Sequence, residues 1–126
     1  MNDLIESLKA PSLEKIIRLE SEMKKFDQIE IETKHYFANG LYAREIFIPK
    51  GVLLTGKIHK TEHLNILSQG EITVWTEEGM KRLKAPYTLV SKPGTKRVGY
   101  AHEDTVWTTI HATNETDLEK LELELI

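Results

Sequence analysis

Residues 63–91 read HLNILSQGEITVWTEEGMKRLKAPYTLVS, and this stretch decides the fold class. Short runs rich in β-branched and apolar residues are separated by turn residues at Gln69-Gly70, Glu78-Gly79 and Ala85-Pro86. We expect strands at His63–Leu67, Glu71–Thr76, Met80–Leu83 and Tyr87–Ser91. Short strands at such close and even spacing predict an antiparallel sandwich or barrel.

The same pattern continues on both sides of this stretch. From residue 29 onward the hydrophobic period is near two, as in half-buried strands. Further strands are expected at Ile29–Thr33, Tyr42–Ile48, Val52–Ile58, Lys96–Ala101 and Val106–His111. The tail from Asp117 to Ile126 alternates leucine with glutamate, which suits either a helix or an edge strand.

Residues 1–28 form a separate helical segment in this prediction, and residues 29–126 form the β domain. Ser12 is the expected N-cap after Pro11. Apolar residues then recur at helical spacing at Leu13, Ile16, Ile17, Met23 and Phe26. The helix packs on the outside of the β domain or exchanges with a partner subunit.

Composition excludes several classes of protein. The chain has 126 residues, 40% of them hydrophobic and 29% charged, which is ordinary for one globular domain. A net charge of −3 argues against nucleic-acid binding, and the lack of cysteine removes disulfide and thiolate chemistry. No apolar run reaches the roughly 18 to 20 residues of a membrane span, and the first residues lack a secretion signal. We therefore expect a soluble cytoplasmic protein, in the host cytoplasm if the chain is viral.

The segment from Lys57 to Gly70 resembles the first motif of the cupin family. That motif has a His-x-His pair, a glutamate and a closing glycine. Here Gly70 matches the closing glycine and His59 matches the second histidine, while Lys57 stands at the first histidine and His63 at the glutamate.

A second cupin motif, Pro-x-Gly-x-x-His, is similar to the turn before the last strands. Pro93 is shifted by one position, Gly94 is kept, and Arg97 stands where the ligand histidine would fall. The resemblance covers roughly residues 40–112 and implies an all-β fold, an antiparallel cupin-type β-barrel (jelly roll) behind an N-terminal α-helix. It also implies a homo-oligomer, since such barrels commonly associate. Leu41–Glu45 and Glu103–Trp107 look like small uncharacterised cupin proteins of tailed phages.

His59 and His63 are the sharpest candidates for chemistry. A spacing of four places both on one face of a regular pleat, where their imidazoles could hold one divalent ion of Zn, Fe, Ni or Mn. His111 is the candidate third ligand. We expect the last two strands to form a hairpin through residues 102–105. In that hairpin an even loop turns His111 away from Arg97, whereas a bulge or an odd loop brings the two together. Both arrangements remain open from the sequence.

Arg97 is the second candidate. An arginine that points into a barrel needs a negative partner, because a buried charge is costly without one. The partner is internal (Glu45, Glu103 or Asp104) or is a carboxylate or phosphate on a bound molecule. Side chains expected to complete a ligand site are Asn65, Tyr100 and Trp107 beside His59, His63 and Arg97.

Three functions follow from these residues. The first is a binding protein that holds a small, anionic molecule in the barrel, which in a phage would sequester a metabolite. The second is a metal-dependent enzyme built on His59 and His63. The third is a virion or accessory protein in which the barrel is only a scaffold.

Overall fold

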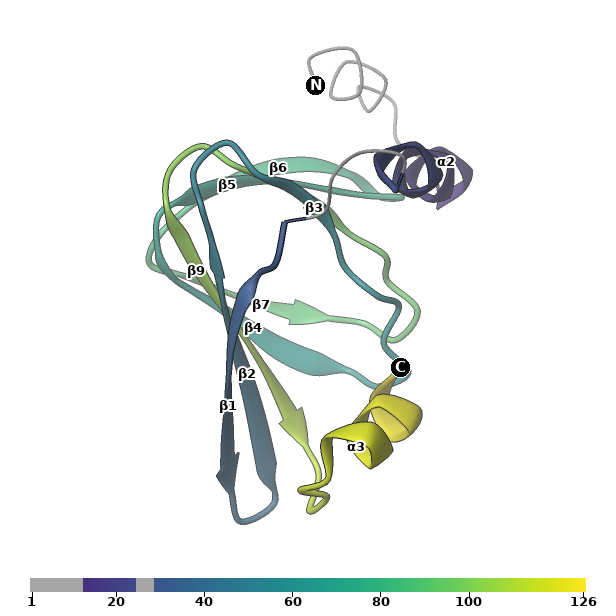
Figure 1. Ribbon diagram of the computed structural model, residues 1–126, viewed down its shortest axis with the longest axis vertical. Coiled ribbons are helices and arrows are strands. Elements are labelled where there is room, and N and C mark those ends of the chain that lie inside the picture. The colour runs from purple at the N-terminus through teal and green to yellow at the C-terminus, as the bar shows by residue number, and fades with distance from the viewer. Residues whose placement is uncertain (1–12, 25–28) are drawn as a thin grey trace.

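The computed structural model describes residues 13–24 and 29–126, and about half of them lie in two facing antiparallel sheets (Figure 1). The five-stranded sheet has the order β1-β2-β9-β4-β7, and the four-stranded sheet has the order β3-β8-β5-β6. The strands are β1 (Glu32–Ala38), β2 (Leu41–Ile48), β3 (Leu53–Thr55), β4 (His63–Gln69), β5 (Glu71–Thr76), β6 (Gly79–Lys84), β7 (Tyr87–Ser91), β8 (Val98–Ala101) and β9 (Thr105–Ala112). The predicted antiparallel jelly roll is thus confirmed, as two separately hydrogen-bonded sheets.

The N-terminal helix α2 (Leu13–Met23) covers the outer face of the four-stranded sheet. Its buried side chains Ile16 and Leu19 pack against residues of β3, β5 and β8. Lys96 adds a nearly buried ion pair, with Nζ 2.8 Å from a carboxylate oxygen of Glu20. The predicted helix is present, while Ser12 and Phe26 lie outside the described residues.

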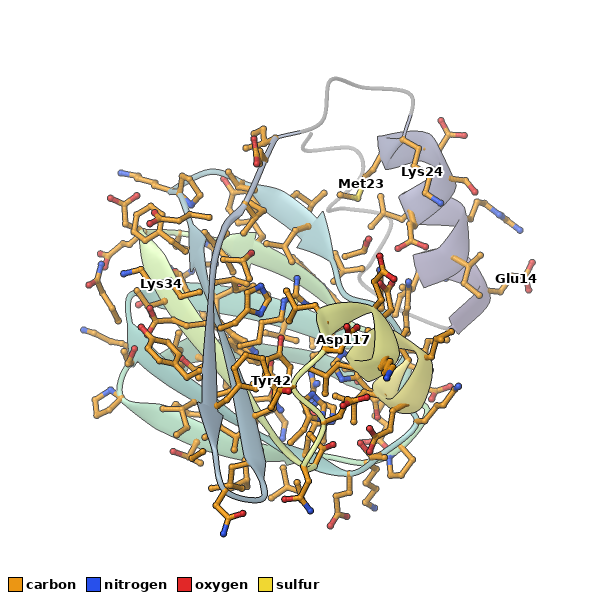
Figure 2. All side chains as sticks on the ribbon, turned by 60° about the horizontal axis from the view of Figure 1, so that its bottom comes forward. Glu14, Met23, Lys24, Lys34, Tyr42 and Asp117 are labelled. Carbon is orange, nitrogen blue, oxygen red and sulfur yellow. The ribbon has the colours of Figure 1, made fainter. Side chains whose placement is uncertain are left out.

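The C-terminal tail is a helix, α3 (Leu118–Leu125), and not an edge strand. Asp117 caps it by accepting hydrogen bonds from the backbone N–H groups of Glu119 and Lys120. Figure 2 shows Tyr42 close to this helix, and Leu121 and Leu125 are buried against that ring. Neither described helix is long enough to cross a membrane.

The space between the sheets is filled at one end and left open at the other. The apolar core consists of Ile48, Leu67, Ile72, Val74, Leu83, Ala101 and Trp107. On the inner face of the five-stranded sheet, two successive cross-strand rows are Ile46-Trp107-Leu67 and Arg44-Thr109-Asn65. The next pair is Tyr42-His111, and the His63 ring lies beside His111. The inner face therefore changes from apolar to polar to histidine-lined along the strands.

Several strand boundaries differ from the prediction. The first strand runs over Glu32–Ala38 instead of Ile29–Thr33, because it pairs along its whole length with β2. Pairing with β8 limits β3 to Leu53–Thr55, so residues 56–62 form no regular strand.

The predicted hairpin between the last two strands is wrong. β8 pairs with β3 and β5, whereas β9 pairs with β2 and β4 in the other sheet. Residues 102–104 therefore connect the two sheets, and no hairpin loop sets the direction of His111.

Gly70 allows the close packing of this connection against the β4–β5 turn. Its φ is +92°, and a Cβ there would lie 2.4 Å from the carbonyl oxygen of Asp104 and 2.6 Å from Oγ1 of Thr105. Both the backbone conformation and the space therefore require glycine.

We predict that Gly70→Ala lowers the free energy of unfolding by about 3 kcal/mol, because backbone strain and a steric clash combine. Gly51→Ala is the matched control: φ there is +85°, but no atom lies within 4 Å of the added carbon. The control should cost only about 1 kcal/mol from the left-handed backbone. Denaturant unfolding measures both changes, and equal losses would contradict the close approach at Gly70.

Candidate metal centre and ligand cavity

Three histidines meet between the open ends of the two sheets. His59 comes from the irregular segment between β3 and β4, His63 begins β4, and His111 lies near the end of β9. Their ring centroids are 4.5 Å (His59–His63), 5.0 Å (His59–His111) and 4.6 Å (His63–His111) apart. One nitrogen of each ring lies within 4.8 Å of the others. The structure thus brings together the three histidines predicted as metal ligands.

The hydrogen bonds of these rings leave nitrogen atoms free for a ligand. Nδ1 of His63 lies 2.9 Å from the carbonyl oxygen of Thr61, which can only accept, so Nδ1 carries the proton and Nε2 keeps its lone pair. Nδ1 of His59 and Nδ1 of His111 are buried with no hydrogen-bond partner among the described residues. A buried polar atom without a partner is costly, and a metal ion is one partner that removes this cost.

The surroundings keep the three rings neutral. Burial is the largest cause that lowers the pKa of His59 to about 4, and the neighbouring histidines and arginines lower it further. Burial likewise lowers the pKa of His111 to about 4, helped by the charges of His63 and Arg44. The pKa of His63 is also lowered, mainly by burial, against the opposing effect of its hydrogen bond to Thr61. Neutral imidazole is the form that binds a metal.

The donor set suits a divalent ion with an open coordination position. Three imidazole nitrogens are the ligands of many catalytic zinc sites, in which water or substrate takes the fourth position. No acidic side chain of the described residues joins the cluster. The ion would therefore keep its full positive charge.

A cavity of about 110 Å³ opens beside the cluster. His59 and His63 line it, and its floor is apolar. The apolar lining residues are Ile46, Ile48, Leu54, Ile72, Val74 and Trp107. At about 30 Å³ per water molecule, this space suits only a small ligand.

Arg97 lines this cavity and lacks the internal partner that the sequence allowed. The arginine is half-buried, and burial lowers its pKa. No carboxylate of the described residues lies within ion-pair distance of it. Asp104 instead accepts a hydrogen bond from the backbone of Lys50, 2.9 Å away, and Glu45 projects from the opposite face of β2. The neighbouring Lys96 forms an ion pair with Glu20. Of these two cationic residues, Arg97 is therefore the one without a carboxylate partner among the described residues.

Arg44 is a cavity residue that our sequence analysis missed. It lies on the inner face of β2, opposite Thr109 of β9, and lines the same cavity from the five-stranded sheet. The signal was present in the sequence: Tyr42 and Arg44 are two residues apart in a strand, so both share one face.

The other predicted ligand residues divide into two groups. Asn65 and Trp107 line the cavity, and they are tied together because Trp107 Nε1 donates to Oδ1 of Asn65 at 3.1 Å. Nδ2 of Asn65 donates to Ser91 at 2.6 Å, so Asn65 organises the cavity wall. Tyr100 lies elsewhere: Gly99 faces the cavity, so the next side chain points to the outer face, where Tyr100 packs beside α2.

Helix α3 holds the segment that carries His59. The carbonyl oxygen of Leu125 accepts from the backbone N–H of Lys60 at 2.6 Å, and that of Leu123 accepts from Lys60 Nζ at 2.8 Å. Lys57 forms an ion pair with Glu122. A second cavity, about 200 Å³, lies between α3 and the cluster and is lined by His59, His111 and Arg44 among others. The C-terminal helix therefore forms one wall of the site.

No protein-family model matches the sequence, and no curated protein is a significant match. Solved structures do match. KdgF from a Halomonas species has a TM-score of 0.60 at 18% identity, covering 76% of this chain and 93% of that protein. A cupin superfamily protein from Desulfitobacterium hafniense has a TM-score of 0.59 at 9% identity, covering 69% and 81% of the two chains.

An RmlC-like cupin from Shewanella frigidimarina has a TM-score of 0.57 at 19% identity, covering 72% of this chain and 89% of that one. These three structures are bacterial, and the resemblance to phage proteins gains no support from them. Identities this low show the fold alone. The chain therefore has the fold of the cupin superfamily, as the motifs around His59 and Arg97 predicted.

Proposed function

We propose that this chain binds a small anionic molecule beside a divalent metal ion held by His59, His63 and His111. The observation that carries the proposal is a cluster of three neutral imidazoles, two of which (His59 and His63) line the same cavity as the half-buried Arg97, an arginine with no carboxylate of the described residues within ion-pair distance. Imidazole nitrogen suits zinc, iron and nickel, whereas manganese prefers oxygen ligands. Zinc, iron or nickel is therefore the expected ion.

The ligand would occupy the cavity between the ion and Arg97. A guanidinium pairs with carboxylate or phosphate through two parallel hydrogen bonds, and the half-buried position of Arg97 strengthens that interaction. The apolar floor would contact the hydrocarbon part of the molecule. Such a site supports tight sequestration of a small acid, the role we expect of a binding protein.

Metal-dependent catalysis is the second candidate. The observation in its favour is that His59 and His63 of the histidine cluster line the cavity, so a ligand in the cavity would lie beside an ion held by the cluster. An ion held there by three protein ligands supplies a Lewis acid that polarises a bound oxygen atom. Arg97 would then orient the acid group of the substrate.

The first test of this proposal concerns metal binding. We expect zinc affinity to fall in each of the variants His59→Ala, His63→Ala and His111→Ala. Loss of a residue that only hydrogen-bonds a metal-ligating side chain typically lowers metal affinity roughly 10–100-fold, and loss of a ligand itself should lower it further. Zinc should also raise the melting temperature of the wild-type protein, because it binds the folded state. Calorimetry and metal analysis measure these effects.

His102→Ala is the matched control for the metal test. This histidine is half-buried and lies 2.6 Å from Oγ1 of Thr73, outside the cluster. Zinc affinity should not change in this variant. Stoichiometric zinc in the double variant His59→Ala/His63→Ala would show that the assigned ligands are wrong.

The lowered pKa values predict how stability depends on pH in the metal-free protein. His59 and His111 have a pKa of about 4 when folded, against an ordinary value near 6.5. The unfolded chain therefore takes up protons first as the pH falls, and the free energy of unfolding should decrease between pH 6.5 and pH 4. Denaturant unfolding across this range should give a flatter profile for His59→Gln/His111→Gln. An equally steep profile in that variant would contradict the assignment.

Replacing Arg97 separates a ligand-binding arginine from a structural one. Arg97→Met should leave the stability of the ligand-free protein unchanged or higher, because no described carboxylate loses a partner. Affinity for a small carboxylate such as butyrate should fall tenfold or more, since a charge-assisted hydrogen bond contributes about 1.5–3 kcal/mol. Unfolding and calorimetry provide the two measurements. A stability loss of about 3–5 kcal/mol would instead indicate a broken internal ion pair.

A further inference from the structure

The cavity is lined by more positively charged side chains than a single bound carboxylate would neutralise. Its lining includes Arg44, Lys57 and Arg97, and no acidic residue among those described. By contrast, Arg82 and Arg18 on the protein surface form ion pairs with Glu71 and Glu14. The cavity is thus a site of uncompensated positive charge.

Lys57 has a carboxylate partner, and the two arginines have none among the described residues. The Lys57 ammonium forms an ion pair with Glu122 of α3. Arg44 lines the second cavity together with Glu122 and contributes to the lowered pKa of that carboxyl. No carboxylate in the described part of the chain lies within ion-pair distance of Arg44 or Arg97, so Glu122 remains engaged by Lys57.

The two arginines approach from opposite walls. Arg44 projects from β2 of the five-stranded sheet, and Arg97 directly precedes β8 of the four-stranded sheet. Both are close enough to His59 that their charges disfavour its protonation. They also differ in exposure, since Arg97 is half-buried and Arg44 lies at the exposed rim.

We propose that the natural ligand is a short dicarboxylate, with one carboxylate held by Arg97 inside the cavity and the other held by Arg44 at its rim. This inference rests on the proposed function, since it names the class of the anionic ligand. Each guanidinium fork matches one carboxylate, and two forks on opposite walls match two carboxylates at opposite ends of a molecule. A cavity of about 110 Å³ between the two arginines favours a short carbon chain between the two carboxylates.

The two arginines should have separable effects. Arg97 is partly desolvated, so it supplies most of the affinity for any carboxylate. Arg44 is exposed, so it adds affinity only for a second carboxylate, and its contribution should weaken with added salt. Discrimination between diacids and monoacids is therefore the specific signature of Arg44.

The experiment compares matched pairs of acids by calorimetry, in the metal-free and the zinc-loaded protein. The pairs have equal carbon numbers: malonate and propionate, succinate and butyrate, glutarate and valerate. We expect at least one diacid to bind tenfold or more tightly than its monoacid. Arg44→Met should remove this preference while monoacid affinity stays within about twofold, and Arg44→Lys should keep part of it. Arg97→Met should weaken both members of each pair.

Arg82→Met is the control, because it also removes one arginine charge but lines neither cavity. The diacid preference should persist in this variant. The inference is overturned if no diacid exceeds its monoacid, or if the preference survives Arg44→Met. An Arg44-dependent preference in a protein that binds no zinc would uphold the dicarboxylate site and reject the metal centre. Zinc binding without any diacid preference would uphold the metal centre and reject the dicarboxylate site.

Discussion

The site depends on the position of β9 between β2 and β4. This strand hydrogen-bonds on both sides, pairing Tyr42 with His111 and Leu64 with Ile110. That register places His111 beside His63 on the inner face. Because side chains alternate along a strand, a shift of one residue would turn His111 outward and bring Ile110 into the cluster. The hydrogen-bond ladder of β9 thus determines the composition of the histidine cluster.

The same register grades the polarity of the inner face. Trp107, Thr109 and His111 follow one another at spacings of two along β9, from the apolar core to the open end. The apolar row fills the closed end, and His63 and His111 are buried at the other end of the inner face. Asn65 links the two regions, since it bonds Trp107 on one strand and Ser91 on another. The cavity therefore has an apolar floor beneath a polar mouth.

Electrostatics connects the two parts of the proposed site. The histidines are neutral, no described carboxylate joins them, and two arginines lie nearby. A bound cation would raise the local potential and be repelled by those arginines. A bound anion would offset that repulsion, so each ligand should strengthen binding of the other to the same degree. The lack of acidic ligands is thus consistent with a site completed by an acidic molecule.

The C-terminal helix supports this arrangement from outside the sheets. The first cupin motif has a histidine at the position of Lys57. In this chain the Lys57 ammonium forms an ion pair with Glu122 of α3. His111 provides the third imidazole of the cluster. Leu121 and Leu125 cover Tyr42, which stacks on His111 with ring centroids 6.3 Å apart. The helix contacts both the His59 segment and the neighbour of His111.

The sequence by itself determined the fold class, most of the strands, and two candidate site residues that are close together in the chain. Period-two patterns and turn glycines are local signals, and His59 and His63 are close in the chain, so both were predictable. It did not determine to which face the His111 side chain points, whether Arg97 has a carboxylate partner, or that Arg44 lines the cavity. Those depend on which strands pair across the chain: β9 joins β2 and β4 instead of β8, and this non-local pairing brings Arg44, His59 and Arg97 around one cavity and places His111 beside His59. Tertiary structure decided the site because long-range strand pairing, and not local propensity, sets which side chains share a face.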